Sequence, residues 1–399
     1  MENSIYMTRT FHPVGHGAFY TERFYTGDGV PEFIVVYDCG CFEAAKSGCS
    51  SIDFVNRINQ VIDDEFTDGT TIDALFVSHF HTDHINGIVH MMKRCRVKRI
   101  FIPKLSLPLI LEACLYPKTM MNVSTLWLLD EIIKSKGRSV GGAKVIQVET
   151  SEGSNLDSKK DIDDIEFLSG STAFCSDILT VKKKWDYIPY FCNSKNDSTL
   201  LSVLRTELSS HGLRLTRDLY EDSKEIKDFV ETLGVEECKK IYEKVYGSKH
   251  NAYSMTLLSK PASCKQKCKR HCLKFGRNPS LCYAACLYMG DYEAKNADNM
   301  ADLKSYYTQY KVWNQVGLIQ VPHHGSENNY NDELYVSPKL CIISAGKSDV
   351  YGHPDTSTLS NIRQKQCVPI IVTEDKKTKQ KFCIDLTEEC CLFKRWFCR

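Results

Sequence analysis

The sequence predicts an α/β fold built from layers. Short apolar runs typical of buried strands alternate with segments in which apolar residues recur every three or four positions, as in amphipathic helices. The chain has 399 residues, of which 42% are hydrophobic, so it can bury a sizeable core. We therefore expect a single domain over residues 1–399, interrupted by insertions.

The predicted elements follow in chain order. Helices are expected from Ser51, where Ile52, Val55, Ile58 and Ile62 form one stripe, and again near 126–133. Residues 151–164 are polar and predict an exposed loop. Residues 205–248 predict a helical insertion with charged outer faces, and residues 375–399 a C-terminal extension. Strands are predicted at 33–37, 73–77, 97–102, 144–148, 254–258, 287–289, 318–321, 342–343 and 370–372.

The most informative segment is 78–84, which reads Ser-His-Phe-His-Thr-Asp-His. It follows the predicted strand 73–77 and precedes a helical pattern, so its side chains should converge at a strand-to-helix turn. Imidazole nitrogens and carboxylate oxygens are ligands for Zn²⁺ and also suit Mn²⁺. A solvated polar turn would rarely gather three histidines and an aspartate, so the segment predicts a metal site.

Three later sites place polar groups directly after predicted strands, where α/β sheets put their ligands. They are Asp291 in Met-Gly-Asp, His323 and His324 in Pro-His-His-Gly-Ser, and His353 in Tyr-Gly-His-Pro. Each alone has a plainer interpretation, because Asp291 could be a turn residue and His353 a loop histidine.

Taken in order, these motifs resemble the metallo-β-lactamase-fold hydrolases. More narrowly, they are similar to the hydrolase domain of ComEC-like competence DNA-uptake proteins. The resemblance covers residues 10–360 apart from the insertions. It rests on Val14–Gly17, Asp38–Gly40, His79–His84, Asn251 with Ser254, Gly290–Asp291, His323–Ser326 and Tyr351–Pro354. It implies a four-layer αββα sandwich with two divalent metal ions, Zn or Mn, at one edge.

The resemblance also implies roles for the site residues. His79 and His81 would hold the first metal, and Asp83, His84 and His323 the second, with Asp291 bridging the pair. Asp38, Asn251, Ser254 and Ser326 would support these ligands through hydrogen bonds. Asp83 would thereby also be a catalytic residue. His324 or His353 would contact a phosphate oxygen or protonate the leaving group. The alternative is that these two histidines only order their loops through hydrogen bonds.

One expected ligand is missing from the motifs. Many relatives supply a third histidine to the first metal from a strand between the main motif and the bridging aspartate. His250 is the best-placed candidate here, although it could simply be a polar residue at a strand entry. Water could also complete this metal.

Residues 260–286 form a cysteine-rich, basic insertion, and we expect a helical hairpin there. Cys268, Cys272, Cys282 and Cys286 could bind a structural zinc ion, form disulfides or remain reduced packing residues. Lys269 and Arg270 could contact a polyanionic substrate or be part of a solvated helix face.

Composition narrows the functional classes. The net charge of +1 provides no global field to attract nucleic acid, so a local patch would have to do so. We find no membrane-spanning stretch and no signal peptide, and expect a cytoplasmic protein without a membrane partner. A protein partner could bind the insertions.

The leading prediction is a metal-dependent phosphodiesterase, most simply a nuclease that cleaves DNA with a metal-activated water. One alternative is hydrolysis of a small phosphodiester, lactone or thioester, because one fold hosts many reactions. Another is a non-catalytic, metal-containing binding or regulatory module.

Overall fold

The computed structural model of the chain describes most of its residues. The described ranges are 5–27, 29–42, 51–115, 123–150, 159–164, 173–175, 178–191, 198–216, 218–247, 254–262, 281–337, 339–347, 351–386 and 392–396. His250, Asn251, Cys268, Lys269, Arg270 and Cys272 lie outside these ranges, so the roles predicted for them stay predictions.

Two large sheets form the centre of the molecule within the described residues. The first has ten strands, in the order β11 (Ala173–Cys175), β9 (Ala143–Val148), β7 (Arg99–Pro103), β5 (Ala74–Phe76), β3 (Pro31–Cys39), β2 (Phe19–Thr26), β1 (Ile5–Phe11), β19 (Gln380–Asp385) and β20 (Leu392–Trp396), with β8 (Ser139–Val140) beside β9. The second has eight, in the order β10 (Lys159–Asp161), β12 (Ile178–Val181), β13 (Trp185–Tyr190), β14 (Thr256–Pro261), β15 (Cys282–Tyr288), β16 (Val316–Gln320), β17 (Leu340–Ser344) and β18 (Val368–Val372). A small separate sheet pairs β4 (Thr71–Ile72) with β6 (Arg96–Val97).

Each large sheet has a parallel half that carries the site. Strands β3, β5, β7 and β9 pair in parallel, and so do β15, β16, β17 and β18. Strands β16 and β17 are buried at every position, which is typical of parallel strands covered on both faces. The antiparallel strands β1, β2 and β19 extend the first sheet on its other side.

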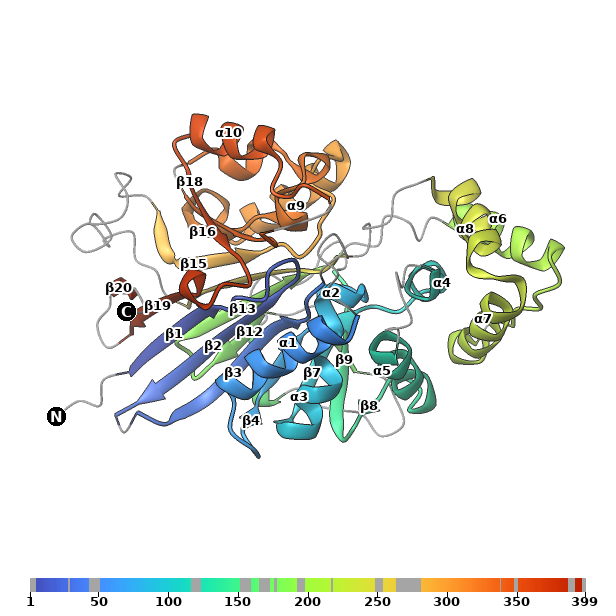
Figure 1. Cartoon of the computed structure of the whole chain (residues 1–399), viewed down its shortest axis with the longest axis horizontal. Coiled ribbons are helices and arrows are strands. Elements are labelled where there is room, and N and C mark those ends of the chain that lie inside the picture. The colour runs from blue at the N-terminus through green and yellow to red at the C-terminus, as the bar shows by residue number, and fades with distance from the viewer. Residues whose placement is uncertain are drawn as a thin grey trace.

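Helices cover the outer faces of both sheets (Figure 1). Helices α1 (Ser51–Glu65), α3 (Ile88–Arg94) and α5 (Val123–Lys134) lie along the first sheet, and α9 (Ala297–Gln309) and α10 (Thr356–Gln364) along the second. Buried residues of α9 and α10, such as Leu303 and Ile362, share one apolar cluster with Ile319 of β16. The predicted four-layer αββα sandwich is therefore confirmed.

Four further helices extend to one side of the sandwich, at the right of Figure 1. They are α4 (Leu107–Leu115), α6 (Ser198–Ser210), α7 (Leu219–Leu233) and α8 (Val235–Tyr246). The segment 205–248, predicted as a helical insertion, contains α7, α8 and the end of α6. Helix α6 begins at Ser198, before the predicted start of the insertion. Among the described helices, none combines the length and apolar character needed to cross a bilayer.

Two local predictions were wrong. Cys282 and Cys286 lie in strand β15 and not in a helical hairpin, and both are buried, free thiols. Residues four apart share a face in a strand as well as in a helix, so their spacing could not distinguish the two. Residues 159–164 are also not all loop, because 159–161 form β10 beside β12.

A buried polar network joins the two sheets. Arg9 of β1 and Glu22 of β2 form an ion pair at 2.7 Å, and Arg9 also donates to Ser259, to the Tyr288 hydroxyl and to the Ala284 carbonyl of the second sheet. Glu22 accepts from the hydroxyls of Tyr187, Ser259 and Tyr288. Burial alone would lower the pKa of Arg9, but Glu22, Tyr288 and Cys286 together outweigh it and the pKa is raised, so the guanidinium stays charged.

This network predicts a large stability loss for Arg9→Met. The substitution would leave the Glu22 carboxylate buried without its counter-charge, and we expect the free energy of unfolding to fall by about 3–5 kcal/mol. The double variant Arg9→Met/Glu22→Gln should be more stable than the single one, because it removes both charges and keeps a side-chain carbonyl for the hydroxyls. Urea unfolding measures both, and a loss below about 1 kcal/mol in Arg9→Met would contradict the prediction.

Candidate metal centre

The predicted site residues meet at the carboxyl ends of parallel strands from both sheets. Asp38 is the last residue but one of strand β3, and the segment after β5 carries His79 and His81 and continues into the short helix α2 (Thr82–Ile85). Asp291 follows β15, and His324 follows β16. Because parallel strands end at one edge of a sheet, these four connections are brought to a common rim.

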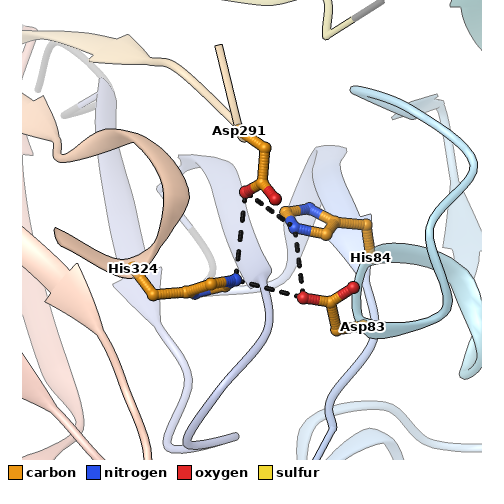
Figure 2. Close-up of side chains that lie close together, drawn as sticks. All are labelled: Asp83, His84, Asp291 and His324. Carbon is orange, nitrogen blue, oxygen red and sulfur yellow. Dashed lines mark hydrogen bonds and ion pairs between the residues drawn. The ribbon is translucent and has the colours of Figure 1, made fainter. Parts of the chain in front are cut away.

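Four side chains form one potential ligand group: Asp83, His84, Asp291 and His324 (Figure 2). His84 Nε2 lies 3.1 Å from Asp291 Oδ1 and 3.7 Å from Asp83 Oδ2. His324 Nε2 lies 3.1 Å from Asp83 Oδ2 and 3.8 Å from Asp291 Oδ1. One potential ligand atom of each residue lies within 4.8 Å of the others. Such spacing allows a single cation to contact all four.

A second group consists of His79, His81 and Asp291. His79 Nε2 lies 3.7 Å from Asp291 Oδ2, whereas Oδ1 of the same carboxylate faces His84. Asp291 thus belongs to both groups and turns a different oxygen toward each. This is the arrangement that a carboxylate bridging two metal ions requires.

Asp38 fixes the orientation of the histidines. It is fully buried and accepts hydrogen bonds from the Ser78 amide (2.7 Å), the Ser78 hydroxyl (2.7 Å) and His84 Nδ1 (2.8 Å). The Ser78 hydroxyl accepts in turn from His79 Nδ1 at 2.9 Å. With both Nδ1 atoms occupied, His79 and His84 present Nε2 to the groups described above, as metal-ligating histidines usually do.

Ser254 positions the backbone of Asp291. Its hydroxyl accepts from the Asp291 amide at 3.0 Å. Gly290 has a φ of +53°, and a Cβ there would lie 2.5 Å from the Ser254 hydroxyl, so this turn requires glycine. Ser326 caps the turn that follows the paired histidines, where its hydroxyl accepts from the Asn328 amide at 3.3 Å.

The paired histidines are placed differently from the prediction. His324, and not His323, lies in the four-residue group, with Nδ1 donating to the Ser344 carbonyl at 2.9 Å. His323 Nδ1 donates to Asn329 Oδ1, and its Nε2 lies 3.7 Å from Asp291 Oδ2. Both residues have positive φ, 48° and 55°, and this local turn sends the two rings in different directions. His324, for which a proton-transfer role was predicted, is thus a candidate ligand in this group. The ligand role predicted for His323 stays a prediction.

His353 lies outside both groups. Its Nδ1 is 3.4 Å from Asp355 Oδ2, and its ring centroid is 5.8 Å from that of His323. The histidine is thus beside the metal centre and not within it.

Electrostatics favour a cation at this position. Burial would raise the pKa values of Asp83 and Asp291, but the neighbouring histidines outweigh it and hold both well below the usual range. Burial, together with His84 and His81, holds the pKa of His79 well below its usual value. Ionised carboxylates and a neutral imidazole are the forms that bind metal. Within the described residues, His79 Nε2, His84 Nε2 and Asp291 Oδ1 are buried without a well-formed hydrogen bond. The donor set therefore fits divalent cations.

For several residues near the site, the sequence predicted no role. Ser78 and His16 stood inside recognised motifs, yet only the structure shows that His16 Nε2 lies 3.5 Å from Asp83 Oδ2. Asn329 donates to the Asp291 and Tyr292 carbonyls and orients His323. Glu112, with Oε1 3.8 Å from His81 Nε2, lies in no motif that could have revealed it.

The shared carboxylate predicts that Asp291→Ala removes both cations. Wild-type protein dialysed against Zn²⁺ or Mn²⁺ should retain two ions per chain, and the variant should bind both at least about 100-fold more weakly, because even residues that only orient a ligand contribute about 10–100-fold. Plasma mass spectrometry and calorimetric titration measure this. His211→Ala, at an exposed histidine on the far helices, should retain two ions. Loss of only one ion in Asp291→Ala would contradict the bridge.

Comparison with known proteins relates part of the chain to a known superfamily. Residues 30–111, from the start of β3 into α4, match the family model described as the metallo-beta-lactamase superfamily. A search of curated proteins finds no match. Among solved structures the chain is similar to unliganded yeast PDE1, with 11% identity, coverage of 95% of this chain and 99% of that chain, and a TM-score of 0.40. The narrower resemblance to competence proteins stays a prediction. The segment that carries His79–His84 thus matches a superfamily composed mostly of metal-dependent hydrolases.

Proposed function

We propose that this protein is a dinuclear metal-dependent phosphodiesterase and that its substrate is DNA. The observation that carries the proposal is the sharing of Asp291 between two ligand groups, each oxygen facing a different one. Two cations held about 3.5–4 Å apart match the demands of in-line displacement at phosphorus, where both the attacking and the leaving oxygen need stabilisation.

The protein's own residues hold and orient this centre. His79, His81 and Asp291 would bind one cation, and Asp83, His84, His324 and Asp291 the other. Bound divalent cations supply Lewis acidity, which activates water and offsets the charge that develops on the phosphate. The hydrogen bonds of Asp38 and Ser344 hold the His84 and His324 rings in place, so little reorganisation is needed when substrate binds.

An aromatic rim beside the metal centre supports a nucleic-acid substrate. We use this name for His16, Phe42, Tyr351 and His353. The His16 ring centroid lies 3.8 Å from that of His324 and 5.5 Å from that of Tyr351, which in turn lies 6.4 Å from Phe42 and 6.1 Å from His353. Tyr351 is 41% exposed. An exposed ring of this kind next to a phosphate-cleaving centre suits the stacking of a nucleobase.

His353 is the candidate for proton transfer in this proposal. Its ring stacks with Tyr351 on the rim, and Asp355 lies 3.4 Å from its Nδ1. An imidazole so placed could donate to a phosphate oxygen or to the leaving group near neutral pH. We propose this role for His353 alone, since His324 lies in a ligand group.

The net charge of +1 favours a second candidate, hydrolysis of a small phosphodiester. Such a substrate needs no extended basic surface, whereas a long polyanion gains affinity mainly from phosphate contacts. Competition distinguishes the two. If DNA is the substrate, short DNA should inhibit hydrolysis of a chromogenic phosphodiester at low concentration, and inhibition should weaken as salt rises.

The proposed activity predicts metal-dependent cleavage that Asp83→Asn abolishes. Purified protein with Mn²⁺ or Zn²⁺ should degrade plasmid and labelled single strands, and chelation should stop it. Asp83→Asn should lower the rate at least about 100-fold, because it removes a charged ligand next to His84 and His324. His211→Ala serves as the control. Equal cleavage by Asp83→Asn, or activity that survives chelation, would refute the proposal.

The rim predicts a substrate effect for Tyr351→Ala. Loss of one stacking ring should raise KM for DNA about tenfold, equivalent to about 1.4 kcal/mol, which lies within the range for base stacking. Hydrolysis of a chromogenic phosphodiester without a base should not change, and Tyr351→Phe should behave like wild type. A KM for DNA that is unchanged in Tyr351→Ala would exclude stacking on this ring.

A further inference from the structure

We propose that a lysine-rich surface at the far end of the second sheet anchors the phosphate backbone of duplex DNA, away from the metal centre. This lysine surface consists of Lys159, Lys160, Lys182, Lys183, Lys184 and Lys260. The inference rests on the proposed function, because it takes DNA as the substrate, and it adds a second contact with that substrate.

The lysine surface and the candidate ligands lie at opposite ends of the same strands. Lys182–Lys184 connect β12 to β13, and Trp185, which begins β13, pairs with Pro261 at the end of β14. The other end of β14 follows Ser254, which positions Asp291. With about 3.3 Å per strand residue, the turn lies about 20 Å from the metal centre. A duplex rises about 3.4 Å per base pair, so one of about ten pairs is long enough to span this separation.

The buried Asp186 holds two of the lysines side by side. Lys159 Nζ and Lys260 Nζ lie 2.8 Å and 3.1 Å from the same oxygen, Asp186 Oδ2. One carboxylate offsets only one of the two ammonium charges, so these three residues keep a net positive charge. The Lys159 side chain is 45% exposed, which leaves part of this charge in contact with solvent.

The turn between β12 and β13 presents three consecutive exposed lysines. Lys182 and Lys183 have φ angles of 50° and 55°, and the Lys184 amide donates to the Val181 carbonyl at 3.0 Å. Positive φ at both central positions is the type I′ geometry, which favours Asn-Gly and disfavours most other residues. Lysine at these positions therefore costs conformational free energy, and such strain is found most often at functional sites.

The turn adds charge that its neighbours do not cancel. Lys182 pairs with Glu32, whereas Lys183 and Lys184 form no ion pair with any other residue that the structure describes. Across the surface, six lysines have two carboxylate partners among the described residues, Glu32 and Asp186. The whole chain carries a net charge of only +1, so this excess is local. A local excess of this kind attracts a polyanion.

Two more carboxylates lie on or next to the edge strand β10. Asp163 is paired with Arg99 at 2.9 Å, so that pair adds no net charge. Asp161 can offset one lysine, which still leaves the surface positive.

The residue types favour contacts with phosphates over recognition of bases. A lysine ammonium is a compact point charge that binds phosphate and carries no direct sequence information when it does so. The lysine surface contains no aromatic ring, unlike the rim, so it offers no platform on which unpaired bases could stack. A duplex, with one charge about every 1.7 Å along its axis, meets these conditions.

The basic insertion leaves the sheet at the same place. Its residue Ala262 donates its backbone amide to the Lys184 carbonyl at 2.9 Å. Residues 263–280 contain six further lysines and arginines in the sequence. They lie outside the described residues, and only the lysine surface carries the proposal.

DNA binding without cleavage tests the proposal. The full chain carrying Asp83→Asn is mixed with a fluorescent duplex of about 30 base pairs, and anisotropy is measured over a range of salt concentrations. Lys182→Asn/Lys183→Gly, added to this parent, removes two charges and supplies the residues that the turn geometry favours. We expect about tenfold weaker binding at low salt and a slope of log K against log salt that is smaller by about 1.8, because each phosphate contact contributes about 0.9.

The matched control is Lys239→Gln/Lys240→Gln in the same parent, which removes two lysines of α8 that pair with glutamates. It should bind the duplex like the parent. Urea unfolding should show that the Asn-Gly variant is at least as stable as the parent, and Lys183→Gln/Lys184→Gln repeats the test without changing the residue at 182.

Three results would overturn the proposal: no binding of the duplex by the parent, unchanged affinity and salt slope in both turn variants, or an equal loss in the control. Binding of the parent to vesicles containing anionic lipid, with no binding to the duplex, would assign the surface to membranes instead. If the turn variants lost affinity for DNA but wild type with Mn²⁺ or Zn²⁺ cleaved none, the proposed function would fail and the DNA-binding surface would stand. If wild type cleaved DNA and the turn variants bound it equally well, this inference alone would fail.

Discussion

The placement of one sheet against the other is the constraint on which the rest of the structure depends. Asp38 and the His79–His84 segment follow strands of the first sheet, whereas Asp291 and His324 follow strands of the second. The two ligand groups can form only if the two sheets keep a fixed position relative to each other. The buried Arg9–Glu22 pair bonds to residues of β13, β14 and β15 across the interface between the sheets. Because all the hydrogen bonds of a buried polar network can be made in few other arrangements, this network fixes how the sheets pack.

Hydrogen bonds closer to the site link the packing of the two sheets to the candidate ligands. The Tyr37 hydroxyl of β3 donates to the Met255 carbonyl beside Ser254, and the Tyr20 hydroxyl of β2 bonds to the Ser344 hydroxyl, whose residue holds His324 through its carbonyl. Both contacts start in the first sheet; one reaches Ser344, which orients His324, and the other reaches Met255, the neighbour of the residue that positions Asp291. The metal centre is thus supported by the same interface that forms the core.

The sequence predicted the part of the site in which several candidate ligands lie close together along the chain. Core packing alone would not place three histidines and an aspartate within six positions, and strands such as β16 and β17 are apolar over most of their length. Strands β1 and β2 were missed because they contain Arg9 and Glu22, which look polar in sequence and are buried only because they pair across strands. Cys282 and Cys286 were misplaced because a spacing of four fits helix and strand alike.

The remaining differences between the sequence prediction and the structure concern geometry that no residue pattern encodes. The choice between His323 and His324 depends on two consecutive positive φ angles, which ordinary histidines rarely adopt and which the sequence does not specify. Glu112 stands in an otherwise apolar helix about thirty positions after the motif, and only the packing of α4 brings it to His81. Sequence spacing identifies candidate ligands that share a turn, but a neighbour contributed by another helix is found only in the tertiary structure.

The two sides of the centre differ in a way that fixes the direction of substrate approach. On the side of His79 and His81, the buried helix α4 closes the site and leaves only a small cavity. On the side of Asp83 and His324, His16 and the partly exposed Tyr351 form the rim. In the proposed function, a phosphodiester would therefore enter past the rim. The helices α6–α8 pack against α4, on the side of the first ligand group.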